Sequence, residues 1–169
     1  MLFRSIGSSP DKTKYILSTG KKHQLQIYEA NTDGLMLSLN YPNEEIYEAG
    51  WFDNENVFLV TRFTLYVVNI ISGEQVGITE DSFEFISRAG KSIGDYIWWI
   101  KDVIKIGDKL YYNGVRSLTD QISSTIYCND KFSEQKLLEK AILLKAVDNQ
   151  HFVYVKQSDE GYAGTFLYN

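Results

Sequence analysis

The stretch that decides the fold is residues 51–78, which read WFDNENVFLVTRFTLYVVNIISGEQVGI. A polar turn at 53–56 leads into an apolar run at 57–60, and a short polar break leads into a second apolar run at 65–71. The Ser-Gly-Glu segment at 72–74 then turns the chain again. Runs of Val, Phe, Leu, Tyr and Ile bounded by Asn, Asp, Gly and Ser are typical of β-strands joined by tight turns. The stretch therefore predicts a β-hairpin followed by a further strand.

The same arrangement returns at intervals of about forty residues. The turn aspartate of the opening stretch, Asp53, has equivalents at Asp11, Asp108 and Asp148, and an apolar run follows each of them. A second candidate strand follows each run, and another precedes each aspartate. Short strands repeated at this interval predict an array of antiparallel four-stranded repeats. We expect a single domain of four repeats, at roughly 1–40, 41–81, 94–139 and 140–169.

These repeats resemble the blades of WD-repeat and related β-propeller proteins. Residues 9–20, SPDKTKYILSTG, carry the resemblance most plainly, together with LQIY at 25–28 and TDG at 32–34. The Trp-Asp pair of that family is replaced here by Tyr28-Glu29, Val68-Asn69 and Cys128-Asn129. The resemblance implies an all-β fold of about four blade-like antiparallel units, forming an open or incomplete small β-propeller. A closed four-blade ring and two packed twisted β-sheets are the alternatives.

Three segments depart from the repeat. The interval between the second and third repeats is about thirteen residues longer than its neighbours, and the excess falls within 80–99. The fourth repeat reaches only its third strand, at 165–168, so we expect it to lack an outer strand. Residues 133–145, SEQKLLEKAILLK, combine helix-forming composition with partly helical apolar spacing. They are interpreted as helix or as a strand followed by a strand, and a mixture of helix and strand is favoured.

Composition excludes several classes of protein. The 169 residues are 44% hydrophobic and suffice for one well-cored domain. The formal net charge of −5 and the absence of a basic cluster argue against a nucleic-acid binder. The single cysteine, Cys128, allows no internal disulfide, and the sequence holds no signal-peptide core and no apolar run long enough to span a membrane. We therefore expect a cytoplasmic protein without membrane segments.

No catalytic or metal-binding motif stands out. His23 and His151 are far apart in sequence and are interpreted as an exposed loop residue and a strand-edge residue, so neither a metal nor a cofactor is expected. Cys128 lies in a predicted strand with no base placed beside it, which favours an inert cysteine. Acidic residues cluster at Glu44, Glu45 and Glu48, where they form a solvated face or a docking surface for a basic protein.

The sequence therefore predicts a non-enzymatic protein-binding module, most specifically a bacterial toxin-neutralising immunity protein that blocks one partner, such as a basic toxin domain. The long interval and the acidic cluster give the expected partner-binding residues: Phe83, Phe85, Asp95, Tyr96, Trp98, Glu44, Glu45 and Glu48. Paired carboxylates leave a hydrolase as one alternative. The other is half of a larger propeller, completed by homo-oligomerisation through the open strand at 165–168.

Overall fold

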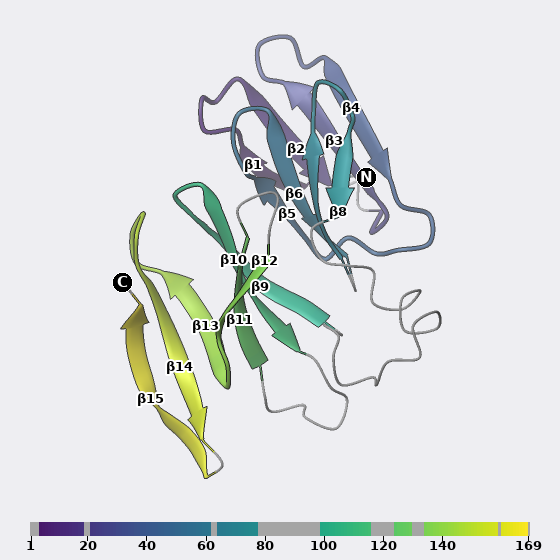
Figure 1. Cartoon of the computed structure of the whole chain (residues 1–169). Coiled ribbons are helices and arrows are strands. Elements are labelled where there is room, and N and C mark those ends of the chain that lie inside the picture. The colour runs from purple at the N-terminus through teal and green to yellow at the C-terminus, as the bar shows by residue number, and fades with distance from the viewer. Residues whose placement is uncertain are drawn as a thin grey trace. The chain divides into compact units, whose positions relative to one another are not determined.

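The protein is built from antiparallel β-sheets, as a computed structural model shows (Figure 1). The structure describes residues 4–18, 21–61, 64–77, 99–115, 124–129, 134–158 and 160–168. Within these ranges the chain forms strands and turns, and no helix is long and apolar enough to cross a membrane. The prediction of an all-β fold with four blade-like antiparallel units is confirmed, since the strands form four separate sheets.

The chain divides into two compact units, of which the first is Met1–Gly77. Its first sheet contains β1 (Arg4–Ser8), β2 (Lys14–Ser18), β3 (Gln24–Glu29) and β4 (Leu35–Asn40). Its second sheet contains β5 (Glu48–Trp51), β6 (Asn56–Val60), β7 (Leu65–Asn69) and β8 (Gln75–Gly77). In both sheets each strand pairs with its neighbour in the chain, so the sheets are meanders (Figure 1).

The second unit is Ile78–Asn169. Its third sheet contains β9 (Trp99–Ile106), β10 (Lys109–Val115), β11 (Ser124–Asn129) and β12 (Glu134–Leu138). Its fourth sheet contains β13 (Ala141–Ala146), β14 (Phe152–Ser158) and β15 (Gly161–Tyr168). The fourth sheet has three strands where the others have four, as the sequence predicted, and β15 forms its outer edge.

The prediction of partial helix at 133–145 is wrong. The segment forms β12 and β13, separated by a turn in which Lys140 has a φ of 50°. β12 pairs with β11 in the third sheet, whereas β13 pairs with β14 in the fourth. Pairing with neighbouring strands therefore overrides the helix-forming composition of Glu, Lys and Leu, because local propensity is weaker than the tertiary contacts of a sheet.

Turn aspartates begin the second strand of three sheets. The Oδ1 atom of Asp53 accepts hydrogen bonds from the backbone N–H groups of Glu55 and Asn56, at 2.9 and 2.8 Å. Asp148 accepts bonds from the N–H groups of Gln150 and His151 in the same way. An aspartate that binds backbone two or three residues ahead stabilises a tight turn. These carboxylates are therefore parts of the scaffold.

Asp11 makes the third of these turns. Its Oδ1 accepts hydrogen bonds from the Ser9 hydroxyl at 2.6 Å and from the Thr13 N–H at 3.0 Å. Hydrogen bonds to the charged form stabilise it. The Ser9 hydroxyl, followed by the Thr13 N–H, thus lowers the pKa of Asp11 to about 2.

The core of the first unit lies between its two sheets. Ile16 and Ile27 of the first sheet and Leu59 and Val68 of the second are fully buried in one cluster. The indole N–H of Trp51 donates a hydrogen bond of 3.1 Å across this cluster to the carbonyl oxygen of Gly7, on β1. Side-chain packing and this partly buried hydrogen bond therefore help to join two sheets that share no strand pairing among the described residues.

Aromatic rings pack on and around the mostly aliphatic core of the second unit. Phe152 is fully buried and stacks on Tyr168, with ring centroids 4.7 Å apart, while Tyr111 of the third sheet meets it at 5.1 Å. Tyr154 stacks on Phe166 along the same face of the fourth sheet, at 5.5 Å. Aromatic pairs of this geometry stabilise a fold beyond the area that they bury.

A buried asparagine also joins the third and fourth sheets. The Oδ1 atom of Asn113, on β10, accepts a hydrogen bond of 2.8 Å from the backbone N–H of Leu143, on β13. Its Nδ2 donates to the carbonyl oxygen of Leu143 at 3.2 Å and to Asp102 Oδ2 at 2.9 Å. The amide of Asn113 therefore pairs with the backbone of β13 as a neighbouring strand would, although no described strand of the third sheet forms a ladder with β13.

Candidate protein-binding site

The structure describes three of the eight predicted partner-binding residues. Glu44, Glu45 and Glu48 lie in the first unit, in the connection that leaves β4 and at the start of β5. We call residues 41–48 the acidic loop. The other predicted residues, Phe83, Phe85, Asp95, Tyr96 and Trp98, lie outside the described residues. The acidic loop is therefore the part of the predicted site that the structure describes.

The acidic loop is fixed to the turn that precedes β3. The N–H of Tyr41 donates to the carbonyl oxygen of His23 at 2.8 Å, and the N–H of Ile46 donates to the carbonyl oxygen of Lys22 at 2.7 Å. The Nδ1 atom of His23 lies 2.6 Å from the carbonyl oxygen of Glu44. A carbonyl oxygen can only accept, so Nδ1 carries the proton in this contact. The loop is thus held at Tyr41 and Ile46 by backbone hydrogen bonds and at Glu44 by the His23 ring.

This role of His23 was not predicted. The sequence suggested an exposed loop histidine, but the side chain is only partly exposed and binds the loop twenty-one residues away. Nothing in the local pattern indicates this contact, because His23 lies in the connection between β2 and β3 and Glu44 in the connection between β4 and β5. The acidic cluster was visible in the sequence, whereas the clamp that holds it was not.

The three glutamates differ in their surroundings. The Glu45 carboxylate forms an exposed ion pair with Lys22, with Nζ and Oε2 3.2 Å apart. Such exposed pairs contribute little to stability, so the carboxylate can exchange partners at low cost. The Oε2 atom of Glu44 is buried and has no hydrogen-bond partner within the described part of the chain. Tyr47, which directly precedes Glu48 in the loop, is 54% exposed.

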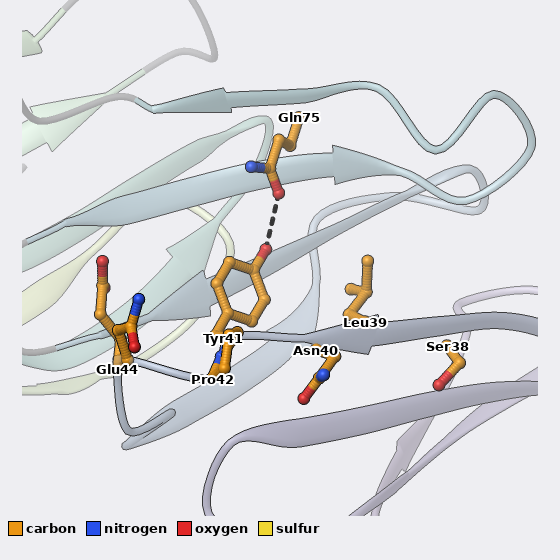
Figure 2. Close-up of a pocket in the computed structure, with 8 residues that line it drawn as sticks. Ser38, Leu39, Asn40, Tyr41, Pro42, Glu44 and Gln75 are labelled. Carbon is orange, nitrogen blue, oxygen red and sulfur yellow. Dashed lines mark hydrogen bonds between the residues drawn. The ribbon is translucent and has the colours of Figure 1, made fainter.

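Two hollows flank the acidic loop. One, of about 260 Å³, is lined by Ser38, Leu39, Asn40, Tyr41, Pro42, Asn43, Glu44 and Gln75. Figure 2 shows the Tyr41 ring pointing from the loop towards Gln75 on β8, and the hydroxyl donates to Gln75 Oε1 at 2.8 Å. Burial, with smaller effects from Tyr66 and Glu44, raises the pKa of Tyr41 to about 12. The hydroxyl therefore stays protonated and keeps this bond at physiological pH.

The second hollow, of about 310 Å³, lies on the other flank of the loop. Its lining includes Lys21, Lys22, Tyr47 and Glu48. Both hollows are open and mixed in polarity, with charged groups at their rims. Together the two hollows make the surface around the acidic loop uneven, and each has room for a protruding side chain.

His151 and Cys128, the remaining residues considered for chemistry, both make contacts within the fold. His151 Nδ1 lies 2.7 Å from the carboxylate of Asp148, and this bond lowers the pKa of that carboxyl group. Cys128 is buried in β11, and burial followed by the nearby cysteine raises the pKa of Tyr111 to about 12. Within the described ranges, no three His, Cys, Asp or Glu side chains are arranged to hold a metal ion.

Comparison with known proteins shows the fold. No protein-family model and no curated protein sequence matches the chain. Among solved structures, the computationally designed protein Ika4 aligns with a TM-score of 0.58 at 12% identity, over 99% of this chain and 92% of that one. YCF48 from Cyanidioschyzon merolae aligns with a TM-score of 0.55 at 14% identity, over 98% of this chain and 49% of that one.

A third similar structure is itself described as a β-propeller domain. The β-propeller domain of Cps50 (Swd1) from Myceliophteria thermophila aligns with a TM-score of 0.52 at 7% identity, over 94% of this chain and 56% of that domain. This chain thus spans about half the length of the two natural proteins. At these identities the likeness concerns architecture alone. It confirms the propeller-like character that the repeats predicted: the chain is an all-β, propeller-like array of meander sheets.

Proposed function

We propose that this protein is a non-enzymatic binding module that blocks one basic protein partner through the acidic loop. In its most specific form it is a bacterial immunity protein that neutralises a toxin domain in the cytoplasm. The observation that carries the proposal is the clamp on the loop: three contacts of 2.6 to 2.8 Å hold a segment with three glutamates against the turn before β3.

Preorganisation supports a binding role. A loop already held in one conformation loses little entropy when a partner binds, so more of the contact energy appears as affinity. The loop also carries an exposed aromatic ring, Tyr47, between carboxylates. Aromatic side chains of this kind often dominate the binding energy of interfaces, while surrounding charges steer association.

Charge supports a basic partner. The protein has a formal net charge of −5, and the acidic loop concentrates three carboxylates in eight residues. The Glu45 carboxylate pairs with Lys22 in an exposed contact, which a cation of a partner could replace at low cost. A basic surface would meet a concentration of negative charge here, and complementary charge raises the association rate, most strongly at low ionic strength.

The test begins with capture of a partner from the source cell and continues with purified proteins. We expect a basic protein whose toxic activity is abolished by one equivalent of this protein. Reversing Glu45 and Glu48 to lysine should slow association about tenfold or more at low salt, with a smaller effect at high salt. Glu55→Lys is the matched control, because Glu55 is exposed in the turn at the opposite end of β5.

Two outcomes would contradict the proposal. Association rates that are unchanged in the Glu45→Lys, Glu48→Lys double variant at low salt would remove the acidic loop from the interface. Equal slowing by the double variant and by Glu55→Lys, after allowance for the number of charges, would show that net charge acts without a defined site.

A further inference from the structure

The outer strand of the fourth sheet has a free edge. β15 pairs with β14 from Phe152 opposite Tyr168 to Ser158 opposite Gly161, with an interruption at Ala163, and no strand of the described chain pairs with its other side. The other three sheets each have a fourth strand in this place. A strand edge presents a row of backbone N–H and C=O groups that can pair with another chain.

Apart from a bulge at Ala163, β15 lacks the features that usually prevent such pairing. Its sequence, GYAGTFLY, contains neither a charged residue nor a proline over eight residues. By contrast, the outer strand β12 carries Glu134 and Lys136, and the outer strand β8 is only three residues long. Tyr162, Phe166 and Leu167 of β15 are 73%, 41% and 55% exposed. The edge is therefore long, neutral and apolar, which favours association.

The sequence of β15 is complementary to itself. We propose that β15 pairs antiparallel with β15 of a second copy of this chain, around a two-fold axis at Thr165. In this register Thr165 faces its own counterpart. Small residues then face large ones: Gly164 lies opposite Phe166, Ala163 opposite Leu167 and Tyr162 opposite Tyr168. Paired Thr residues and paired aromatic residues are favourable cross-strand neighbours, and two copies of a neutral strand bring no like charges together.

The first unit contains a pair of the same kind. In the second sheet Phe58 lies directly opposite Gly50, and a Cβ atom on Gly50 would lie 2.6 Å from the Phe58 ring. The ring thus covers the glycine across the strand pair. The Phe166 ring of the same chain already lies 3.5 Å from the place of a Cβ atom on Gly164, and Phe166 of a second copy would extend this cover of the glycine backbone from across the strand pair.

A bulge in β15 limits the size of the proposed dimer interface. The pairing with β14 is interrupted at Ala163, where β15 carries one additional residue. The bulge disturbs the outer pairs, Ala163 with Leu167 and Tyr162 with Tyr168. Regular pairing is therefore confined to Thr165 and to the Gly164–Phe166 pair on either side of the axis, and the resulting interface is small. Interfaces well below about 1,200 Å² are usually weak and transient. We accordingly expect a dimer that dissociates on dilution.

Cysteine crosslinking tests the register directly. Thr165 is exposed, so Thr165→Cys should leave the fold intact and place two thiols opposite each other at the axis. Mild oxidation of the full chain should convert most of this variant to a disulfide-linked dimer. Ser38→Cys is the matched control, since Ser38 is exposed on the outer strand β4 of the first sheet. Cys128 is buried in the parent chain.

Sedimentation equilibrium tests the association without a covalent bond. The unaltered protein should show a concentration-dependent monomer–dimer equilibrium, and Thr165→Lys should shift it at least tenfold towards monomer, because two lysines would face each other at the axis. Circular dichroism would verify that the variant is folded. The proposal is overturned if the parent protein stays monomeric at millimolar concentration, or if Thr165→Cys crosslinks no faster than Ser38→Cys.

Discussion

Replacing Asn113 by alanine should destabilise the second unit strongly. The side chain is fully buried and makes three hydrogen bonds, two of them to the backbone of Leu143. The substitution leaves the N–H and C=O of Leu143 without these partners. An unsatisfied buried group costs about 1–3 kcal/mol, so the loss of unfolding free energy should be about 3 kcal/mol. With a urea dependence of about 2 kcal/mol/M, the unfolding midpoint should fall by about 1.5 M.

Ser124→Ala provides the matched comparison. The Ser124 hydroxyl is buried and donates one hydrogen bond of 2.6 Å to the carbonyl oxygen of Ala141, also on β13. One lost bond should cost about 1 kcal/mol. Urea unfolding followed by circular dichroism should therefore rank Asn113→Ala clearly below Ser124→Ala, and both below the parent protein.

Hydrogen exchange gives a residue-level measurement. The amide proton of Leu143 donates to Asn113 Oδ1, so its protection should fall markedly in Asn113→Ala and remain near the parental value in Ser124→Ala. The reasoning would be refuted by an Asn113→Ala protein within 0.5 kcal/mol of the parent, which is about the effect of a neutral surface substitution, with the Leu143 amide still protected.

Other substitutions test the first unit. Gly50→Ala should destabilise by about 2 kcal/mol in urea unfolding, because its Cβ would lie 2.6 Å from the Phe58 ring; Gly77→Ala, whose Cβ would meet its nearest neighbour at 3.6 Å, should be close to neutral. Trp51→Phe should lower the unfolding free energy by about 1–2 kcal/mol, since it removes a hydrogen bond between sheets and some packing. The depressed pKa of Asp11 contributes stability that is present above pH 4 and lost as the pH falls towards 2; Asp11→Asn should flatten the pH dependence of the melting temperature in that range.

The strands and turns could be predicted from the sequence because their signals are local. Alternating apolar runs and the turn residues around Asp11, Asp53 and Asp148 act over a few positions, and the structure confirms strands beside each of them. The wrong prediction at 133–145 has the same origin. The local composition is typical of a helix, and it is the pairing with β11 and β14 that makes the segment form strands.

The interactions between sheets could not be predicted in this way. Asn113 lies thirty residues from Leu143, and the sequence around it reads as an ordinary strand. A polar residue inside the apolar run of β10 was the available signal, but it does not identify the partner. The clamp of His23 on Glu44 is equally non-local. The acidic loop was found from its charge, whereas its conformation depends on contacts that a sequence pattern does not contain.

The meander connectivity also bears on how the protein folds. Every strand in the described sheets pairs with a neighbour in the chain, so each sheet can assemble from contacts of short sequence separation. Proteins dominated by such contacts fold faster than β-proteins with long-range pairing. The longest steps join completed sheets, as in the Trp51–Gly7 bond over 44 residues and the Asn113–Leu143 bonds over 30. We therefore expect the sheets to form early and their docking to limit the folding rate. Substitutions at Asn113 and Trp51 should then change the rates of sheet docking and of unfolding, and should leave the formation of individual hairpins unaffected.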